Sequence, residues 1–479
     1  MATDATRARW RTELPFLVAL GAAALVRVVL AVTFAPAFLM SDGPEYLTYA
    51  HHLSPNPDRP VGYSIFLRGL SEVSGSLALV TSVQLVLGLL GAVAAYALLR
   101  RWGVAPWVAT LATVPMLFDA MQLLFEHAVL SDMFFDFLVL VAVAALAWSP
   151  TPHVGTTLLA GGLLGMATVV RVVGEPTVVL AALFLLLVAG SWRARVVHVV
   201  LVLAAFAVPV TAYAAWYHDA HGSWALSQTG GRALYMRTTT FVDCSQVQLP
   251  RYERVLCPQE PLGQRKDPTW YGWHSPDTVP KLQPPPGVSD DQAMHDFAIR
   301  AIKAQPGSYV RDVARDFGLG FVSVDRNDHF EMQTSVKWKL AKIVAYEHSS
   351  PAMTLAFDTY LGGIPTPWQP GADVLGWYGR VVYLPGPLAL LLVVVAVAGV
   401  VVRRRDQRPS LRPLALLTLA LPLVLVLVPD VTAQFVWRYQ LPLVVLLPLS
   451  AALGWTRLRA AGGVDVGAGD GAPLDGSSR

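Results

Sequence analysis

Two carboxylates stand close together directly after the first long apolar segment, in the stretch MSDGPEYLTYAHHL at residues 40–53. Asp42 and Glu45 are three residues apart, so they share one face if this stretch forms a helix. Carboxylates in such a place act as general bases, as metal ligands or as caps of an amphipathic helix that lies on the bilayer. Since charge at the edge of a membrane must find water or a partner, the pair indicates either such a cap or a polar site.

Other ionisable residues are predicted to lie at the same depth relative to the membrane as Asp42 and Glu45. They are Asp119, Glu126, His127, Asp132 and Asp136 around the junction of the third and fourth apolar segments, Arg171 and Glu175 at the end of the fifth, and Arg438 at the start of the last. Carboxylates suit acid/base or metal chemistry, and arginines suit a phosphate, although structural ion pairs inside a helix bundle are the alternative. The set predicts a polar cavity at one membrane interface.

The composition defines the elements that must position these residues. Of the 479 residues 54% are hydrophobic and 14% are charged, which is typical of a polytopic membrane protein. Ten apolar runs are long enough to cross a bilayer, and nine to twelve is the range that the pattern allows. The runs are 14–36, 76–99, 105–124, 132–149, 154–173, 176–190, 197–217, 380–402, 412–429 and 439–455. The first follows basic residues but lacks a cleavage site, so we expect a retained span.

The basic residues predict the orientation. They lie before the first span and after the second, sixth, eighth and tenth: Arg7, Arg9, Arg11, Arg100, Arg101, Arg193, Arg195, Arg403, Arg404, Arg405, Arg408, Arg457 and Arg459. With ten spans all of these fall on one side, which the positive-inside rule makes cytoplasmic. Both termini are then cytoplasmic, and the net charge of +3 needs no nucleic-acid partner to explain it.

The predicted organisation follows from these spans. It comprises a cytoplasmic N-terminus (1–13), an N-terminal transmembrane module with interfacial helices in its first outer loop (14–217), an extracytoplasmic domain of mixed structure (218–379), C-terminal transmembrane helices (380–455) and a disordered cytoplasmic tail (456–479). We therefore expect an all-α polytopic membrane protein with about ten transmembrane helices. We find no internal repeat of the kind on which many transporters are built.

The outer domain has three further signals. Ser289 is a predicted N-cap of a helix with the apolar stripe Ala293, Phe297, Ile299 and Ile302, and a second amphipathic stretch covers 309–321. Cys244 and Cys257 both lie in this domain, which favours a disulfide on the oxidising side. The aromatic residues of WYGWHSP (270–276) and Tyr235 form either a sugar-binding surface or, as we favour, the core of the domain.

Several short motifs, taken in order, resemble one family. SDGPEYL with Asp42 and Tyr46, RPVGYSIFL with Tyr63, EHAVLSDMFF with Glu126, His127 and Asp132, RVVGEP with Arg171, and WRYQLPLVVLLPL with Arg438 and Tyr439 are similar to motifs of the GT-C superfamily of membrane glycosyltransferases. The resemblance is greatest to the bacterial relatives of protein O-mannosyltransferases and aminoarabinose transferases. It covers the membrane half, about 14–217 and 376–455, and the outer domain only loosely.

The resemblance implies a function and assigns roles. A polyprenyl-phosphate-linked sugar is the expected donor, an acceptor hydroxyl of a protein, lipid or cell-wall glycan is the acceptor, and transfer occurs with inversion at the outer face of a bacterial plasma membrane. Asp42 is the expected general base, and Arg171 and Arg438 hold the phosphate. The substrate site is also lined by Glu45, Tyr46, Tyr63, Glu126, His127, Asp132 and Tyr439. Some relatives bind a divalent cation such as Mg²⁺ or Mn²⁺, for which Glu126 and Asp132 are weak candidates.

Two other classes of function fit the composition. A transporter or flippase of a lipid-linked or anionic substrate also needs charge within the membrane, but the acids here gather at one face and not at the midplane. A noncatalytic scaffold of an envelope-assembly complex is the third class. For Arg27, in the middle of the first span, we expect snorkelling or an internal pair in place of substrate contact.

Overall fold

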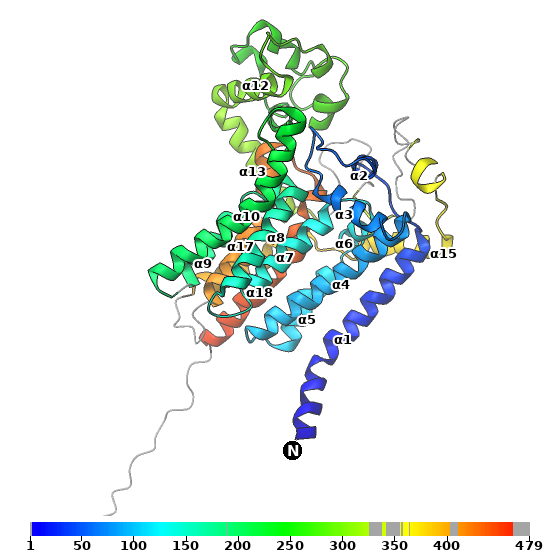
Figure 1. Ribbon diagram of the computed structural model, residues 1–479, viewed down its shortest axis with the longest axis vertical. Coiled ribbons are helices and arrows are strands. Elements are labelled where there is room, and N and C mark those ends of the chain that lie inside the picture. Colours follow the sequence, from blue (N-terminus) through cyan, green and yellow to red (C-terminus); the bar gives the residue numbers. More distant parts are fainter. Residues whose placement is uncertain are drawn as a thin grey trace, which may run out of the picture.

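The computed structural model describes residues 2–188, 190–324, 338–341, 355, 358–363, 365–402 and 411–462. The predicted basic loop after residue 402 and the tail from residue 463 lie outside these residues. The described residues form helices and irregular turns, and they contain an isolated bridge between Phe38 and Ala128 but no strand. Most helices run side by side in one bundle, and the helices of the predicted outer domain extend from one end of it (Figure 1).

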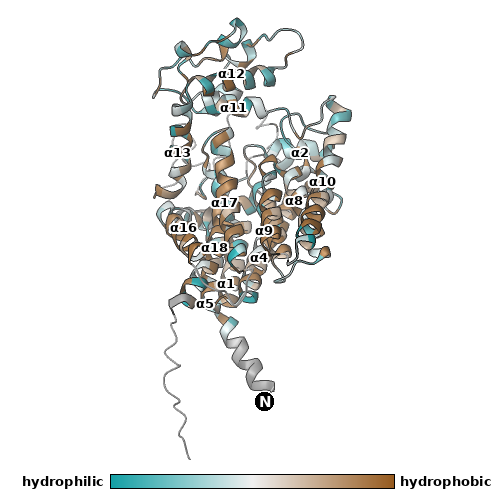
Figure 2. Cartoon of the chain, turned by 90° about the vertical axis from the view of Figure 1, so that its left-hand side faces the viewer, coloured by the Kyte–Doolittle hydropathy of each residue, from teal (hydrophilic) through white to brown (hydrophobic). Residues whose placement is uncertain are grey.

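The bundle contains the apolar helices, and the hydropathy of the chain falls sharply beyond its end (Figure 2). Its helices are α1 (Ala2–Thr33), α4 (Leu77–Arg101), α5 (Pro106–Phe118), α6 (Ala120–His127), α7 (Asp132–Leu146), α8 (Val154–Val170), α9 (Thr177–Val188), α10 (Trp192–His221), α16 (Gly386–Val401), α17 (Leu411–Thr432) and α18 (Leu441–Gly462), with the short helices η1 (Val172–Gly174) and η6 (Trp437–Gln440). Many large apolar side chains on these helices are exposed, as lipid contact requires.

The structure supports a multi-pass membrane protein but does not fix the number of spans. Among the described residues five helices are long and apolar enough to cross a membrane, namely Thr12–Thr33, Leu77–Arg101, Trp192–His221, Leu411–Thr432 and Trp437–Ala460. Two pairs bent by 50°, α5 with α6 and α15 (Gln369–Val381) with α16, raise the number to seven. The remaining predicted spans correspond to α7, α8 and α9, which have 15, 17 and 12 residues. The count of ten stays a prediction.

Two helices of the bundle approach each other closely through glycine. A methyl group at Gly161 of α8 would lie 2.5 Å from the carbonyl oxygen of Val202, and one at Gly165 would lie 2.4 Å from that of Phe206, both on α10. Small residues four positions apart let the backbones of membrane helices pack directly against each other. This contact fixes α8, and hence the position of Arg171 at its end.

Two short helices fill the first outer loop. They are α2 (Gly43–His51) and α3 (Gly62–Ser71), in the two stretches that the sequence predicts to be interfacial. On α2 the apolar residues Tyr46, Leu47 and Ala50 are buried, so the apolar side of this helix packs onto the protein. Asp42 precedes α2, and its side chain does not cap the helix.

The predicted outer domain has its own small core. Its elements are α11 (Gly230–Thr238), η2 (Cys244–Gln246), η3 (Arg251–Leu256), η4 (Trp270–His274), η5 (Val279–Lys281), α12 (Asp290–Ala304) and α13 (Pro306–Val322). The expectation of mixed structure is therefore not met by the described residues of this region, which are helical and irregular. The predicted disulfide between Cys244 and Cys257 is present and packs beside this core.

The two predicted helices of the outer domain are confirmed. The hydroxyl of Ser289 accepts a hydrogen bond from the backbone N–H of Gln292 at the start of α12, as an N-cap does. Ala293 and Phe297 are buried as expected, whereas Ile299 and Ile302 are only half-buried, because the buried face turns toward Met294, Ala298 and Ala301. The amphipathic stretch 309–321 lies within α13.

Candidate functional site

Six charged side chains meet at the end of the bundle that faces the outer domain, and we call them the ion-pair network. They come from five places in the chain: Asp42 and Glu45 at the start of α2, Arg59 before α3, Asp132 at the start of α7, Arg171 after α8, and Arg438 in η6. Carboxylates and guanidinium groups alternate through the network. Asp132 and Arg438 are buried and the other four members are half-buried, so the charges at the centre depend on their neighbours for solvation.

Asp42 is held from both sides by arginines. Nη1 of Arg59 lies 2.5 Å from Oδ1 of Asp42, and Nη1 of Arg438 lies 2.7 Å from Oδ2. Arg59 also reaches Glu45, with Nη2 3.0 Å from Oε2. Ser41, just before Asp42, has a φ of 50°, a left-handed conformation that residues other than glycine rarely adopt. This turn leads the chain into α2 and directs Asp42 toward the arginines.

Asp132 is the second centre of the network. Nη1 of Arg171 lies 2.5 Å from its Oδ1, and Nε and Nη2 of Arg438 lie 2.9 Å and 2.8 Å from Oδ2. Arg438 therefore bridges Asp42 and Asp132, which belong to loops 90 residues apart. Because the guanidinium group of Arg438 contacts both Asp42 and Asp132, a ligand that bound Arg438 would change the electrostatic surroundings of both carboxylates.

The surroundings shift the pKa values of the first-loop groups in opposite directions. Burial raises the pKa of Asp42, but the guanidinium groups of Arg59 and Arg438 outweigh it and hold this pKa well below its usual range. Burial also raises the pKa of Glu45, and Arg59 offsets this only in part. Burial lowers the pKa of Arg59, yet Asp42 and Glu45 hold it above its usual range. Asp42 is consequently the more acidic carboxyl group of this pair.

A small pocket opens beside Asp132, and we call it the interface pocket. Its polar lining is Asp132, Asp136, Arg171, Arg438 and Tyr439, and its apolar lining is Phe135, Val173, Leu425, Pro429, Leu441 and Pro442. The pocket lining thus combines charged side chains with apolar residues, four of which belong to helices α17 and α18. This arrangement suits a ligand with an anionic head and an apolar tail.

Aromatic rings cover the arginines of the network. The guanidinium carbon of Arg171 lies 5.7 Å from the ring centre of Tyr439, that of Arg59 lies 5.8 Å from Tyr46, and that of Arg438 lies 5.4 Å from Trp338. The Tyr46 hydroxyl also lies 3.0 Å from the hydroxyl of Ser131. Rings over guanidinium groups stabilise their charge and fix their orientation.

Three predicted site residues make their hydrogen bonds within the helix bundle. Both carboxylate oxygens of Glu126 accept hydrogen bonds of 2.7 Å from Arg27, the internal pairing expected for that mid-span arginine. A ring nitrogen of His127 lies 2.9 Å from the carbonyl oxygen of Phe34, and the Tyr63 hydroxyl donates to Oε1 of Gln84 at 2.6 Å. All three side chains are fully buried. Among the described residues Glu126 and His127 thus bond within the bundle, whereas the Tyr63 ring also packs edge-on against Tyr46 beside the ion-pair network, with 5.0 Å between the ring centres.

Some members of the site were not predicted. Arg59 is present in the motif RPVGYSIFL, but only Tyr63 of this motif was predicted to be a site residue. Asn56, whose side chain hydrogen-bonds to Glu45, and Trp338 carry no sequence signal that separates them from other loop residues. Asp119, which was predicted to be in the same polar set, caps α6 by accepting from Met121 N–H and also accepts from Leu384 N–H.

The carboxylates do not form an evident metal site. In the described part of the chain no three His, Cys, Asp or Glu side chains lie close enough to hold an ion. Both oxygens of Glu126 are bonded to Arg27, and both oxygens of Asp132 are bonded to Arg171 and Arg438. Because a cation would have to displace guanidinium groups, the two candidate ligands do not fit the expected Mg²⁺ or Mn²⁺, and no chemical step is derived through it.

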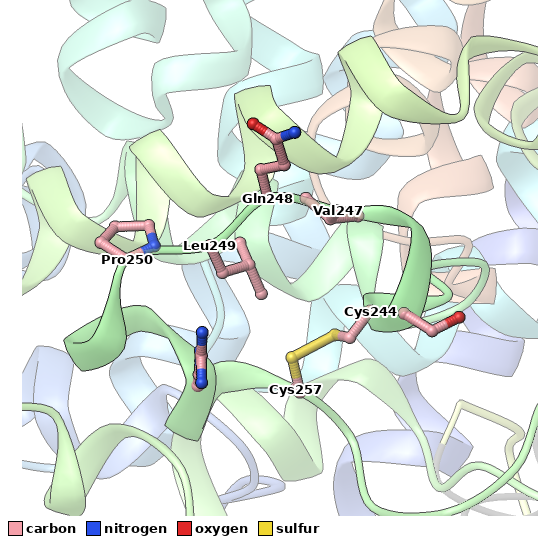
Figure 3. A pocket seen from close by; sticks show the side chains of 8 residues that line it. Cys244, Val247, Gln248, Leu249, Pro250 and Cys257 are labelled. Carbon is pink, nitrogen blue, oxygen red and sulfur yellow. A yellow bond between two sulfur atoms is a disulfide. The ribbon is translucent and has the colours of Figure 1, made fainter.

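The outer domain has a separate surface pocket of about 690 Å³ between η2 and η3. It is lined by Cys244, Ser245, Val247, Gln248, Leu249, Pro250, Arg254 and Cys257. Figure 3 shows the disulfide beside Leu249, with Gln248 directed away from the sulfur atoms. The aromatic residues favoured as core are placed accordingly, since Tyr235 and Tyr271 are buried, although Trp273 is 40% exposed.

The fold and site define a multi-pass helical membrane protein with a charged pocket at one end of its apolar helices. Comparisons with known protein families and with curated sequences find no match. Among solved structures the chain is similar to the S. cerevisiae protein O-mannosyltransferase Pmt1-Pmt2 complex bound to the sugar donor, with a TM-score of 0.36 and 16% identity. The similarity covers 53% of this chain and 38% of that chain, so less than half of the neighbour is matched.

Protein O-mannosyltransferases are also among the relatives that the sequence motifs resemble.

Proposed function

We propose that the protein is an integral membrane glycosyltransferase that transfers a sugar from a polyprenyl-phosphate-linked donor to an acceptor hydroxyl at the outer membrane interface. The observation that carries the proposal is the convergence of Asp42, Arg438, Asp132 and Arg171 from separate parts of the chain, next to a pocket whose remaining lining is mostly apolar. A lipid-linked donor needs both surfaces at once, because its tail stays in the bilayer while its phosphate lies at the interface.

Arg171 and Arg438 are the proposed phosphate ligands. Guanidinium groups bind phosphate oxygens through paired hydrogen bonds, and they would stabilise the charge of the departing lipid phosphate. Within the described contacts Arg171 uses only Nη1, for Asp132 and Ser131, so its Nε and Nη2 groups are available to a ligand. Tyr439 fixes the plane of this arginine from the side.

Asp42 is the proposed general base. In an inverting transfer the acceptor oxygen bonds to the anomeric carbon as the bond from that carbon to the phosphate oxygen breaks, and the hydroxyl proton passes to the base. In the structure Arg438 holds Asp42 and depresses its pKa. A phosphate bound at Arg438 would share this guanidinium group and thereby increase the basicity of Asp42 at the moment when the donor is present.

The identity of the substrates is a finer part of the proposal. We propose a bacterial plasma membrane, a hexose or pentose donor, and a protein or envelope glycan as acceptor, on the basis of the sequence resemblance. Glu45 and Tyr46 line the acceptor side next to Asp42, and Arg59 holds both carboxylates in place.

The test uses cells that lack the gene and are complemented with wild type or with Asp42→Asn. Mass spectrometry of envelope glycans and glycoproteins should show a sugar modification that wild type restores. Asn keeps the shape but cannot accept the proton, so we expect transfer to fall by about 100-fold or more. Glu72→Gln, at an exposed pair with Arg68, is the matched control and should restore transfer fully. Unchanged transfer by Asp42→Asn at equal protein abundance would remove Asp42 as the base.

A transporter or flippase of a lipid-linked or anionic substrate is the alternative class. In sealed vesicles it would move a lipid-linked sugar across the bilayer without forming a new glycosidic bond. Movement without transfer would contradict the proposed function, whereas a new glycosidic bond would contradict the transporter.

A further inference from the structure

Asp136 is a buried carboxyl group for which the proposed reaction has no role so far. It lies one helical turn after Asp132 on α7 and lines the interface pocket. Only 4% of its surface is exposed, and within the described residues its Oδ1 atom has no hydrogen-bond partner. A buried polar atom without a partner is costly unless a ligand or water completes it.

The charges around Asp136 determine its protonation state. The ion-pair network contains the carboxylates Asp42, Glu45 and Asp132 against the guanidinium groups of Arg59, Arg171 and Arg438, so it is already neutral. An ionised Asp136 would add an uncompensated buried charge beside Asp132. Since such a charge is strongly unfavourable, the carboxyl group remains protonated and can donate a hydrogen bond.

We propose that the protonated carboxyl group of Asp136 binds the phosphate of a prenyl-phosphate ligand in the interface pocket, as a hydrogen-bond donor beside the arginine pair Arg171 and Arg438. This inference rests on the proposed function and adds a residue to its donor site. A neutral donor suits this position, because it stabilises an anion without requiring another buried counter-charge.

The test measures binding of farnesyl phosphate to the full-length protein in lipid nanodiscs, with farnesol as the uncharged comparison. Asp136→Asn retains an N–H donor and should bind farnesyl phosphate within about threefold of wild type, whereas Asp136→Ala should bind it about tenfold or more weakly. Farnesol binding should be the same in all three proteins. Asp430→Asn is the matched control: it changes another buried carboxyl group with an unpartnered oxygen, outside the pocket lining.

Three results would overturn the inference. Equal affinity of wild type and Asp136→Ala for farnesyl phosphate would show that the carboxyl group does not contact the phosphate. Equal weakening by Asn and Ala, or an equal loss of farnesol binding, would show a role in shaping the pocket only. If these results occur while Arg171→Ala still weakens phosphate binding, the proposed function stands without Asp136. If wild type does not bind farnesyl phosphate better than farnesol, both proposals fail.

Discussion

Arg59 shows how one residue can set the chemistry of another. It pairs with Asp42 and Glu45 at 2.5 Å and 3.0 Å, and it is the first of the two arginines that hold the pKa of Asp42 below its usual range against burial. A carboxylate held so firmly is ionised over the whole physiological range. Arg59 and Arg438 together therefore determine the basicity of Asp42.

Replacing Arg59 should therefore change the pH dependence of transfer. A base must be ionised, so activity declines as the pH falls through the pKa of Asp42. Wild type should show no acidic limb from Asp42 in the measured range, because the two arginines hold this pKa well below its usual range. Arg59→Gln removes the larger lowering charge, which raises the pKa of Asp42 and should bring an acidic limb into the measured range. Transfer rates in isolated membranes, measured from about pH 4 to 8, check this.

Arg68→Gln provides the control, because Arg68 forms an exposed i,i+4 pair with Glu72. Its pH–rate profile should coincide with that of wild type. An Arg59→Gln profile that coincides with that of wild type would mean that Asp42 is not the group whose ionisation limits the rate.

The sequence predicted most, but not all, of the residues of the candidate site. Asp42, Glu45, Asp132, Arg171 and Arg438 were placed at one level by their positions at the ends of apolar runs, and the structure brings them together. The ends of the apolar runs predict how deep a residue lies along the membrane normal. They do not predict to which side of its helix the side chain points. Glu126 and Asp132 are at similar depth, yet Glu126 turns toward Arg27 inside the bundle.

For the helices too, the sequence predicted the apolar spans but not how each of them is directed. Apolar length predicted α1, α4, α10, α17 and α18, each of which is long enough to span. It could not predict that the run 105–124 would bend by 50° at Asp119, because that bend depends on a cap to α6 and on a distant contact with Leu384. Long-range partners of this kind leave no periodic signal in a single sequence.

The contact between α8 and α10 gives a prediction for this scale. Gly161→Ala places a methyl group 2.5 Å from the carbonyl oxygen of Val202, so the helices must separate. Overpacking of this type costs about 1–3 kcal/mol, and we expect a lower unfolding temperature and weaker transfer, since Arg171 follows α8 directly. Thermal unfolding of the purified protein in detergent measures the change.

The neighbouring Gly162 is a matched control, because a methyl group there meets no atom within 4 Å. Gly162→Ala should leave stability unchanged or raise it by up to about 1 kcal/mol, since alanine favours a helix over glycine. Equal effects of the two substitutions would mean that helix propensity, and not the close contact with α10, decides the outcome.

At the scale of the whole molecule, the two ends of the bundle differ in charge and in contacts. At one end Arg100 pairs with Glu13, Arg101 bonds to the carbonyl oxygen of Trp148, and Arg459 lies over the ring of Trp107. These contacts show that the basic ends of α1, α4, α5 and α18 are neighbours. The predicted outer domain, with α12, and the N-terminus lie at opposite ends of the molecule (Figure 1). The structure thus gathers basic residues at the end that sequence predicts to be cytoplasmic.

This asymmetry predicts the orientation in the membrane. Basic residues are retained on the cytoplasmic side, so the ion-pair network and the disulfide-bearing domain should face outward. Green fluorescent protein fused after the C-terminus should fluoresce, whereas alkaline phosphatase fused there should be inactive, and alkaline phosphatase inserted at Gly263, an exposed loop position of the outer domain, should be active. The reverse pattern would place Asp42 on the cytoplasmic side and would exclude an acceptor at the outer face, even if the chemistry of the pocket were correct.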